Sequence, residues 1–181
     1  MRNFLLGILC TVIVLAVAAW LSLKQGYIDF AADHPPSLLE TKFAMAAVDA
    51  STEKRAPRSS DPVAPTDDNI AAGAKLYLDH CAGCHGIPST PDSQFSRSFY
   101  PAVPAFFKDS PDMPEAQNFY IVQHGIRWTG MPAWGQTLSD DQIWQVVLFL
   151  SNIEKLPPAA QKVFGNSTEG APMPQGMHMS Q

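Results

Sequence analysis

The longest apolar run of the chain lies at its amino terminus, from Phe4 to Leu23, and carries no charge. At about 1.5 Å of rise per residue, a helix over this run matches the roughly 30 Å hydrocarbon core of a bilayer. Ala16-Val17-Ala18 resembles a signal-peptide cleavage site, but the apolar core of a cleaved signal is usually only about 7–15 residues long. Residues 1–23 therefore predict a transmembrane anchor, with a signal sequence as the alternative.

Residues 24–66 show neither a helical nor a strand period over any sustained length. The segment mixes small residues, both signs of charge and several prolines, among them Pro35-Pro36 and Pro57. We expect a flexible, proline-rich tether, in which only Leu38–Val48 contains enough helix formers for a short helix.

Apolar positions at helical spacing return in residues 67–155, which predict the folded domain. A helix capped by Asp67 or Asp68 runs toward Cys81 with one apolar face. Near the other end, Ser139 and Gln142 have the spacing of a capping box. The helix that follows them, Ile143–Ile153, is apolar almost all round, so we expect it to be buried on more than one side.

The sequence between these two helices contains many helix breakers and one further probable helix, Pro114–Gly125. No alternating strand pattern is present, so the predicted fold class is all-α, with short helices and loops. About ninety residues of this kind form only a small core, and a bound group is expected to help fill it. Residues 156–181 are polar and aperiodic and predict a disordered tail.

The clearest candidate for a functional site is the stretch CAGCH, in which Cys81 and Cys84 are three positions apart and His85 directly follows Cys84. This spacing is typical of covalent c-type haem attachment, in which the two thiols bind the porphyrin and the histidine binds iron. A redox dithiol and a zinc site are the alternatives. The dithiol lacks a preceding strand, and the only further cysteine, Cys10, lies in the apolar N-terminal run.

The domain resembles the class I c-type cytochromes, in particular membrane-anchored bacterial members with one haem. The resemblance rests on Gly73 and Tyr77, the CAGCHG stretch, GMPAWG at residues 130–135, and a closing helix that ends in VVLFL. It implies a small all-α cytochrome c domain around one haem c, attached through Cys81 and Cys84. It also implies that an aromatic residue of the last helix approaches Gly73, and Phe149 or Trp144 matches that position.

The resemblance further implies a second axial ligand, and Met131 matches the family position in a loop before the closing helix. Met113 and His124 are the alternatives. A thioether ligand favours reduced iron and therefore a positive reduction potential.

We expect two further kinds of haem contact. The resemblance implies that the carbonyl of Pro101 or Pro104 accepts the other imidazole N–H of His85. The position of Arg127 and Trp128 in GIRWTGMPAW indicates a contact with a haem propionate, with a solvent-exposed arginine as the alternative.

The chain carries a formal net charge of −5, and the domain has ten acidic and five basic residues. Nucleic-acid binding is therefore not expected, whereas a basic patch on a protein partner would be attracted.

We predict an electron carrier rather than an enzyme, tethered to a membrane with its domain on the periplasmic side. It would serve membrane-bound donors and acceptors of a respiratory or dehydrogenase chain. The alternatives are a subunit of a larger oxidoreductase and a five-coordinate haem sensor or peroxidase-like protein.

The tail also contains soft sulfur and nitrogen donors of the kind that bind cuprous ion. These residues are Met173, Met177, His178 and Met179. We expect a disordered tail that binds no metal, and copper binding by these residues is the alternative.

Overall fold

The computed structural model describes residues 1–27, 29–58, 61–93 and 95–165. Two units are distinguished, residues 1–34 and residues 35–181. In the described ranges every regular element is helical, and the only pairing of extended backbone is an isolated bridge between Ile87 and Thr90. The all-α prediction is confirmed.

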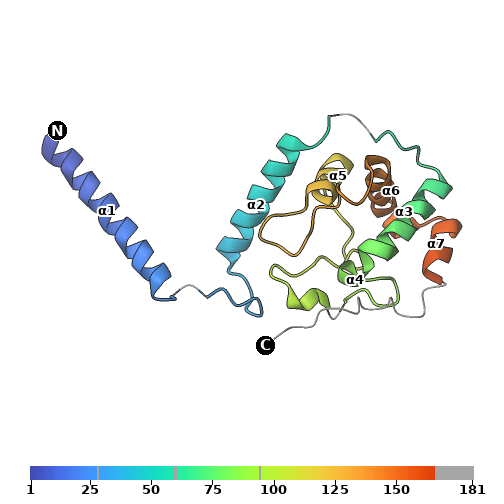
Figure 1. The fold of residues 1–181 in the computed structure, drawn as a ribbon, viewed down its shortest axis with the longest axis horizontal. Coiled ribbons are helices and arrows are strands. Elements are labelled where there is room, and N and C mark those ends of the chain that lie inside the picture. Colours follow the sequence, from blue (N-terminus) through green and yellow to red (C-terminus); the bar gives the residue numbers. More distant parts are fainter. Residues whose placement is uncertain (28, 59–60, 94, 166–181) are drawn as a thin grey trace. The chain divides into compact units, whose positions relative to one another are not determined.

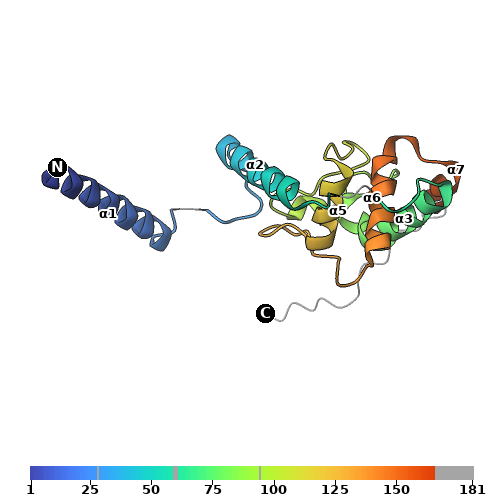
Figure 2. The same ribbon diagram turned by 90° about the horizontal axis from the view of Figure 1, so that it is seen from above.

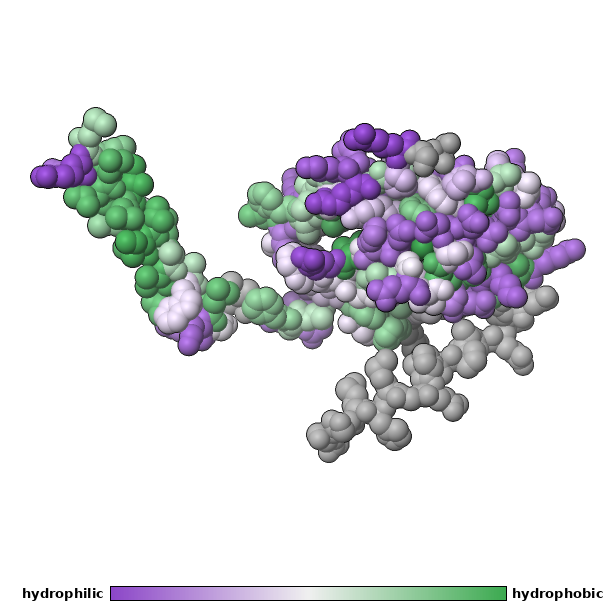
Figure 3. Space-filling view, turned by 45° about the horizontal axis from the view of Figure 1, so that its top comes forward, coloured by the Kyte–Doolittle hydropathy of each residue, from purple (hydrophilic) through white to green (hydrophobic). Residues whose placement is uncertain are grey.

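The first unit consists mainly of helix α1, Arg2–Lys24. None of its residues is buried, and the space-filling view shows this surface as predominantly hydrophobic (Figure 3). By length and composition α1 is able to cross a membrane. Lys24, in the last turn, lies 5.3 Å from the ring centre of Trp20.

The centre of the second unit is the crossing of α3, Asp67–His80, with α6, Asp140–Ser151 (Figures 1 and 2). The backbones approach closely, because a Cβ on Gly73 would lie 1.9 Å from the carbonyl oxygen of Gln145 and 3.0 Å from the Cβ of Phe149. Only glycine fits this crossing. Phe149, rather than Trp144, is thus the aromatic residue that faces Gly73.

Helix α6 is buried on two sides, as its composition predicts. One side joins α3 in a core cluster around Tyr77 and Phe149, whose ring centres are 5.0 Å apart. The other side joins α5, Glu115–His124, where Trp144 stacks on Phe119 at 4.3 Å. The predicted capping box at Ser139 and Gln142 is present, with both of its hydrogen bonds.

Three short helical segments complete the domain. They are α4, Ala82–His85, and the 3-10 turns η1, Phe95–Ser98, and η2, Ile153–Lys155. The helix predicted over Pro114–Gly125 is present as α5 and is slightly shorter. Pro114 is its N-cap, and Gly125, with a φ of +67°, is its C-cap.

Helix α2, Leu38–Arg55, lies inside the segment predicted as a tether and extends beyond the predicted end at Val48. The Ser37 side chain caps its first turn, and Lys54 and Arg55 stand where the helix dipole favours positive charge. The helix contacts α5. The prediction that residues 24–66 form a flexible tether along their whole length is therefore wrong, because an ordered helix that packs on the domain occupies their middle.

The predicted disordered tail is also corrected at its start, because α7 covers Pro158–Gly165. Ala160 is fully buried, and Val163 and Phe164 pack against the cluster around Tyr77 and Phe149. Positions i, i+3 and i+4 share one helix face, so even this short helix buries an apolar stripe against α3. The Met173, Met177, His178 and Met179 group lies outside the described residues.

Candidate functional site

The CAGCH residues lie on one tight turn at the end of α3. The amide of Cys81 donates to the carbonyl of Tyr77 at 2.8 Å, and the amides of Cys84 and His85 both donate to the carbonyl of Cys81, at 3.1 and 2.9 Å. Gly86 ends the turn with a φ of +82°, a backbone conformation that glycine adopts without strain. The turn therefore holds two thiols and one imidazole close together.

The imidazole of His85 is held from two directions. Its Nδ1 donates to the carbonyl oxygen of Pro104 at 2.9 Å, and the ring of Phe106 stacks on it at 4.3 Å with planes 7° apart. Within the described residues Nε2 has no hydrogen-bond partner. Burial lowers the pKa of His85, with the Pro104 carbonyl acting in the opposite direction. A neutral imidazole with a free, oriented Nε2 is a suitable ligand for iron.

The two thiols are free and partly buried. Burial, and then the neighbouring Cys84, raise the pKa of Cys81 to about 12, and burial also raises the pKa of Cys84. Catalytic dithiols depend on a lowered thiol pKa, so this environment is opposite to the one they require. In the described part of the chain no group of three His, Cys, Asp or Glu residues is arranged to hold a metal ion. The turn fits covalent haem attachment better than either alternative.

Two side-chain hydrogen bonds stabilise the turn, one buried and one exposed. The Tyr77 hydroxyl donates to the carbonyl of Gly86 at 2.8 Å, deep in the domain. The Ser93 hydroxyl donates to the carbonyl of Gly83 at 2.6 Å. The backbone on both sides of Cys84 is therefore fixed by side chains from outside the turn.

Met131 lies in a loop with its own hydrogen-bond network. The amide of Ile126 donates to the carbonyl of Met131 at 3.2 Å, and the amide of Met131 donates to the Thr129 hydroxyl at 3.1 Å. A Cβ on Gly125 would lie 2.6 Å from the Met131 carbonyl oxygen, so glycine allows the loop to close. Met131 is half-buried and packs against the cluster around Trp144 and Phe119.

The Met131 loop meets the segment that leads to Pro104. A Cβ on Gly130 would lie 2.3 Å from the ring of Phe99. Phe99 belongs to the same connection as Pro104 and Phe106, which hold His85. The loop with the candidate sixth ligand and the loop that positions His85 are thus in contact.

The remaining sequence-predicted residues lie as follows. Pro101 is exposed, and the carbonyl within reach of His85 belongs to Pro104. Arg127 is exposed, and Trp128 is 91% exposed with a φ of +63°. His124 is exposed at the end of α5.

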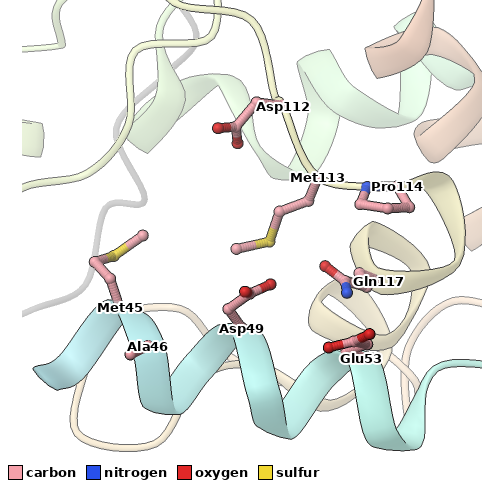
Figure 4. Close-up of a pocket in the computed structure, with 8 residues that line it drawn as sticks. All are labelled: Met45, Ala46, Asp49, Glu53, Asp112, Met113, Pro114 and Gln117. Carbon is pink, nitrogen blue, oxygen red and sulfur yellow. The ribbon is translucent and has the colours of Figure 1, made fainter. Parts of the chain in front are cut away.

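Met113 lines a cavity beside α2 whose wall includes none of Cys81, Cys84, His85 and Met131 (Figure 4). The environment of Met113 therefore differs from that of Met131, although a proline follows each of them in the sequence.

Three contributions were not predicted from the sequence: the stacking of Phe106 on His85, the Tyr77 hydroxyl bond to Gly86, and the Thr129 hydroxyl beneath Met131. The position of Phe106, two residues after Pro104, was the available signal for the first.

The match to a known protein family is consistent with a c-type cytochrome domain. Residues 68–150 match the family described as cytochrome c oxidase, cbb3-type, subunit III. Among solved structures, a chain of the reducing HAO-like protein complex of Kuenenia stuttgartiensis matches with a TM-score of 0.45 and 22% sequence identity. That alignment covers 54% of the present chain and 50% of the other, so only about half of its length is represented. No curated protein matches the chain.

Proposed function

We propose that the c-type cytochrome domain formed by residues 68–150 carries one electron at a time on a covalently attached, six-coordinate haem c. The observation that carries this proposal is the state of His85. It directly follows Cys84, is fixed through Nδ1 by Pro104 and across its face by Phe106, and has Nε2 free.

The roles of the chain's residues follow from this arrangement. Cys81 and Cys84 would form the thioether links, and His85 and Met131 would hold the iron. The haem supplies the reversible one-electron couple. Pro104 holds the proton on Nδ1, which leaves Nε2 as the donor nitrogen. Arg127 and Trp128 are proposed to contact a propionate.

The assignment of Met131 is supported by its half-buried place in the loop that touches Phe99. Met113 instead extends from its loop toward α2 (Figure 4). The two methionines therefore form a matched pair for an experiment, since each precedes a proline and only one is proposed as a ligand.

The experiment uses the full-length protein in detergent. We expect its mass to include one covalent haem, and its oxidised spectrum to show the far-red band that marks methionine sulfur on ferric haem. Met131→Ala should abolish this band and allow carbon monoxide to bind the reduced protein, while Met113→Ala should do neither. A colourless protein would overturn the proposal. Loss of the band in Met113→Ala but not in Met131→Ala would show that Met113, rather than Met131, is the iron ligand.

Wild-type protein that binds carbon monoxide when reduced would instead support the five-coordinate sensor or peroxidase-like function. The same spectra therefore separate the carrier from this rival.

A second candidate function is that of a cytochrome subunit within a larger oxidoreductase. The family that matches residues 68–150 is described as an oxidase subunit, which favours this role. Blue-native electrophoresis with haem staining tests it, because a free carrier migrates alone and a subunit comigrates with its complex.

We further propose that α1 anchors the protein and that the domain lies on the periplasmic side, where haem thioethers are formed. Its partners are then membrane-bound electron donors and acceptors. The net charge of −5 supports the attraction of basic partner surfaces.

A further inference from the structure

A cavity of about 530 Å³ lies between α2 and the start of α5 (Figure 4). Helix α2 contributes four lining residues, and the segment that enters α5 contributes the other four. They are Met45, Ala46, Asp49, Glu53, Asp112, Met113, Pro114 and Gln117. None of them is a proposed haem contact, so the cavity is a separate feature of the domain.

The charge of the cavity is negative and uncompensated. Asp49, Glu53 and Asp112 are exposed carboxylates on its wall, and no basic residue lines it. Within the described residues none of the three side chains has a hydrogen bond or an ion pair. The cavity therefore attracts cations.

Gln117 adds an independent observation. Its side chain is 93% buried, since 7% remains exposed, and its Oε1 has no hydrogen-bond partner. The amide group points into the cavity (Figure 4). A buried acceptor without a donor is unfavourable, so a ligand that donates to it removes part of this cost.

The remaining wall is apolar and adaptable. Met45 and Met113 place flexible thioether side chains beside the carboxylates (Figure 4). Methionine surfaces accommodate alkyl chains, whereas a compact hydrated ion gains nothing from them.

Two properties decide the class of cation. The carboxylates are not gathered closely enough to hold a metal ion, as noted above for the described residues. A guanidinium group has five N–H donors in a planar fork and can bridge acceptors that lie apart, while its alkyl stem packs on apolar surface. We propose that this cavity binds an arginine side chain presented by a protein partner.

The test uses the full-length haem protein, labelled with ¹⁵N, in detergent micelles. A capped Gly-Arg-Gly peptide is titrated, and the side-chain amide signals of Gln117 report on the cavity itself. We expect saturable shifts of these signals and at least about fivefold weaker binding of a capped Gly-Lys-Gly peptide. Absence of saturable shifts overturns the proposal, and equal binding of the two peptides overturns the choice of arginine.

Matched charge variants separate the cavity from general attraction. Asp49→Asn and Glu53→Gln should each weaken arginine-peptide binding by about fivefold. Asp79→Asn and Asp109→Asn, which remove one exposed carboxylate each outside the cavity, should change it less than about twofold. Equal losses in both sets overturn the proposal. Because Gln117 reports binding without any electron transfer, failure here leaves the proposed carrier function unaffected, and failure of that function leaves this test intact.

Discussion

The Tyr77 hydroxyl connects the core of the domain to the turn that carries His85. It donates to the Gly86 carbonyl at 2.8 Å in a fully buried position. Tyr77→Phe removes the donor and leaves a buried carbonyl unsatisfied, so we expect a loss of about 1–3 kcal/mol in the free energy of unfolding, measured by denaturant titration. Tyr120→Phe is the control, because Tyr120 is half-buried and its hydroxyl makes no hydrogen bond to any residue that the structure describes. Equal stability of the two variants would contradict this role of Tyr77.

Gly73 permits the closest backbone contact between α3 and α6. A methyl group there would lie 1.9 Å from the Gln145 carbonyl oxygen, which cannot move without moving α6. Gly73→Ala should therefore destabilise the domain by about 1–3 kcal/mol or more, seen as a lower thermal midpoint. Gly83→Ala, where the same methyl group meets nothing within 4 Å, should leave the midpoint nearly unchanged. A harmless Gly73→Ala would show that the helices separate more easily than this packing implies.

Residues with a fixed spacing were predictable from the sequence, whereas contacts across the loops were not. The spacing of Cys81, Cys84 and His85 follows directly from the chain, and Gly73 is recognisable within one helix. The stacking of Phe106 depends on how a proline-rich connection folds back on His85. That connection has no period from which its path could be inferred.

Helix α2 is tied to the domain near its beginning by a hydrogen bond from the Tyr100 hydroxyl to the Glu40 carboxylate. This bond raises the pKa of Tyr100 to about 12. A raised pKa means that folding favours the protonated hydroxyl, so the contribution is complete below about pH 10 and is lost as the pH rises through about 12. Ultraviolet titration of the phenolate, with Tyr100→Phe subtracted, should give this raised value, and Glu40→Gln should return it toward 10. An unchanged pKa in Glu40→Gln would remove Glu40 as the cause.

Helix α7 is expected to stabilise the domain although it is short. Ending the chain after residue 165 should preserve the thermal midpoint, whereas ending it after residue 157 removes Ala160, Val163 and Phe164 from the core cluster. The second truncation should lower stability by about 2–4 kcal/mol, since full burial of a Val or Phe side chain contributes about 1.5–3 kcal/mol and these two are partly buried. Equal midpoints would show that α7 adds nothing to the core.

The two elements that the sequence prediction missed or shortened share a physical reason. Helix α2 has an unremarkable apolar stripe and gains its order from a Ser37 cap and contact with α5. Helix α7 follows Pro157 and spans only about two turns, too few for a periodic signal. Both depend on tertiary packing, which local pattern does not reveal.

At the scale of the whole molecule, α1 is proposed to keep the domain at a membrane. Replacing residues 1–34 with a cleavable export signal should release a soluble protein that retains its haem. Cell fractionation followed by haem staining measures both outcomes, and the full-length chain is the control. A replaced chain that still sediments with membranes would show that another surface binds lipid or a membrane protein.

The order of α2 shortens the connection between anchor and domain to residues 25–37. Fully extended, this stretch reaches roughly 45 Å. With α1 in a bilayer, a redox partner in the same membrane and within that radius experiences an effective concentration on the order of millimolar. For the proposed anchored carrier, electron exchange with such a neighbour would be first order, and its rate would depend on how the two proteins are spaced in the bilayer.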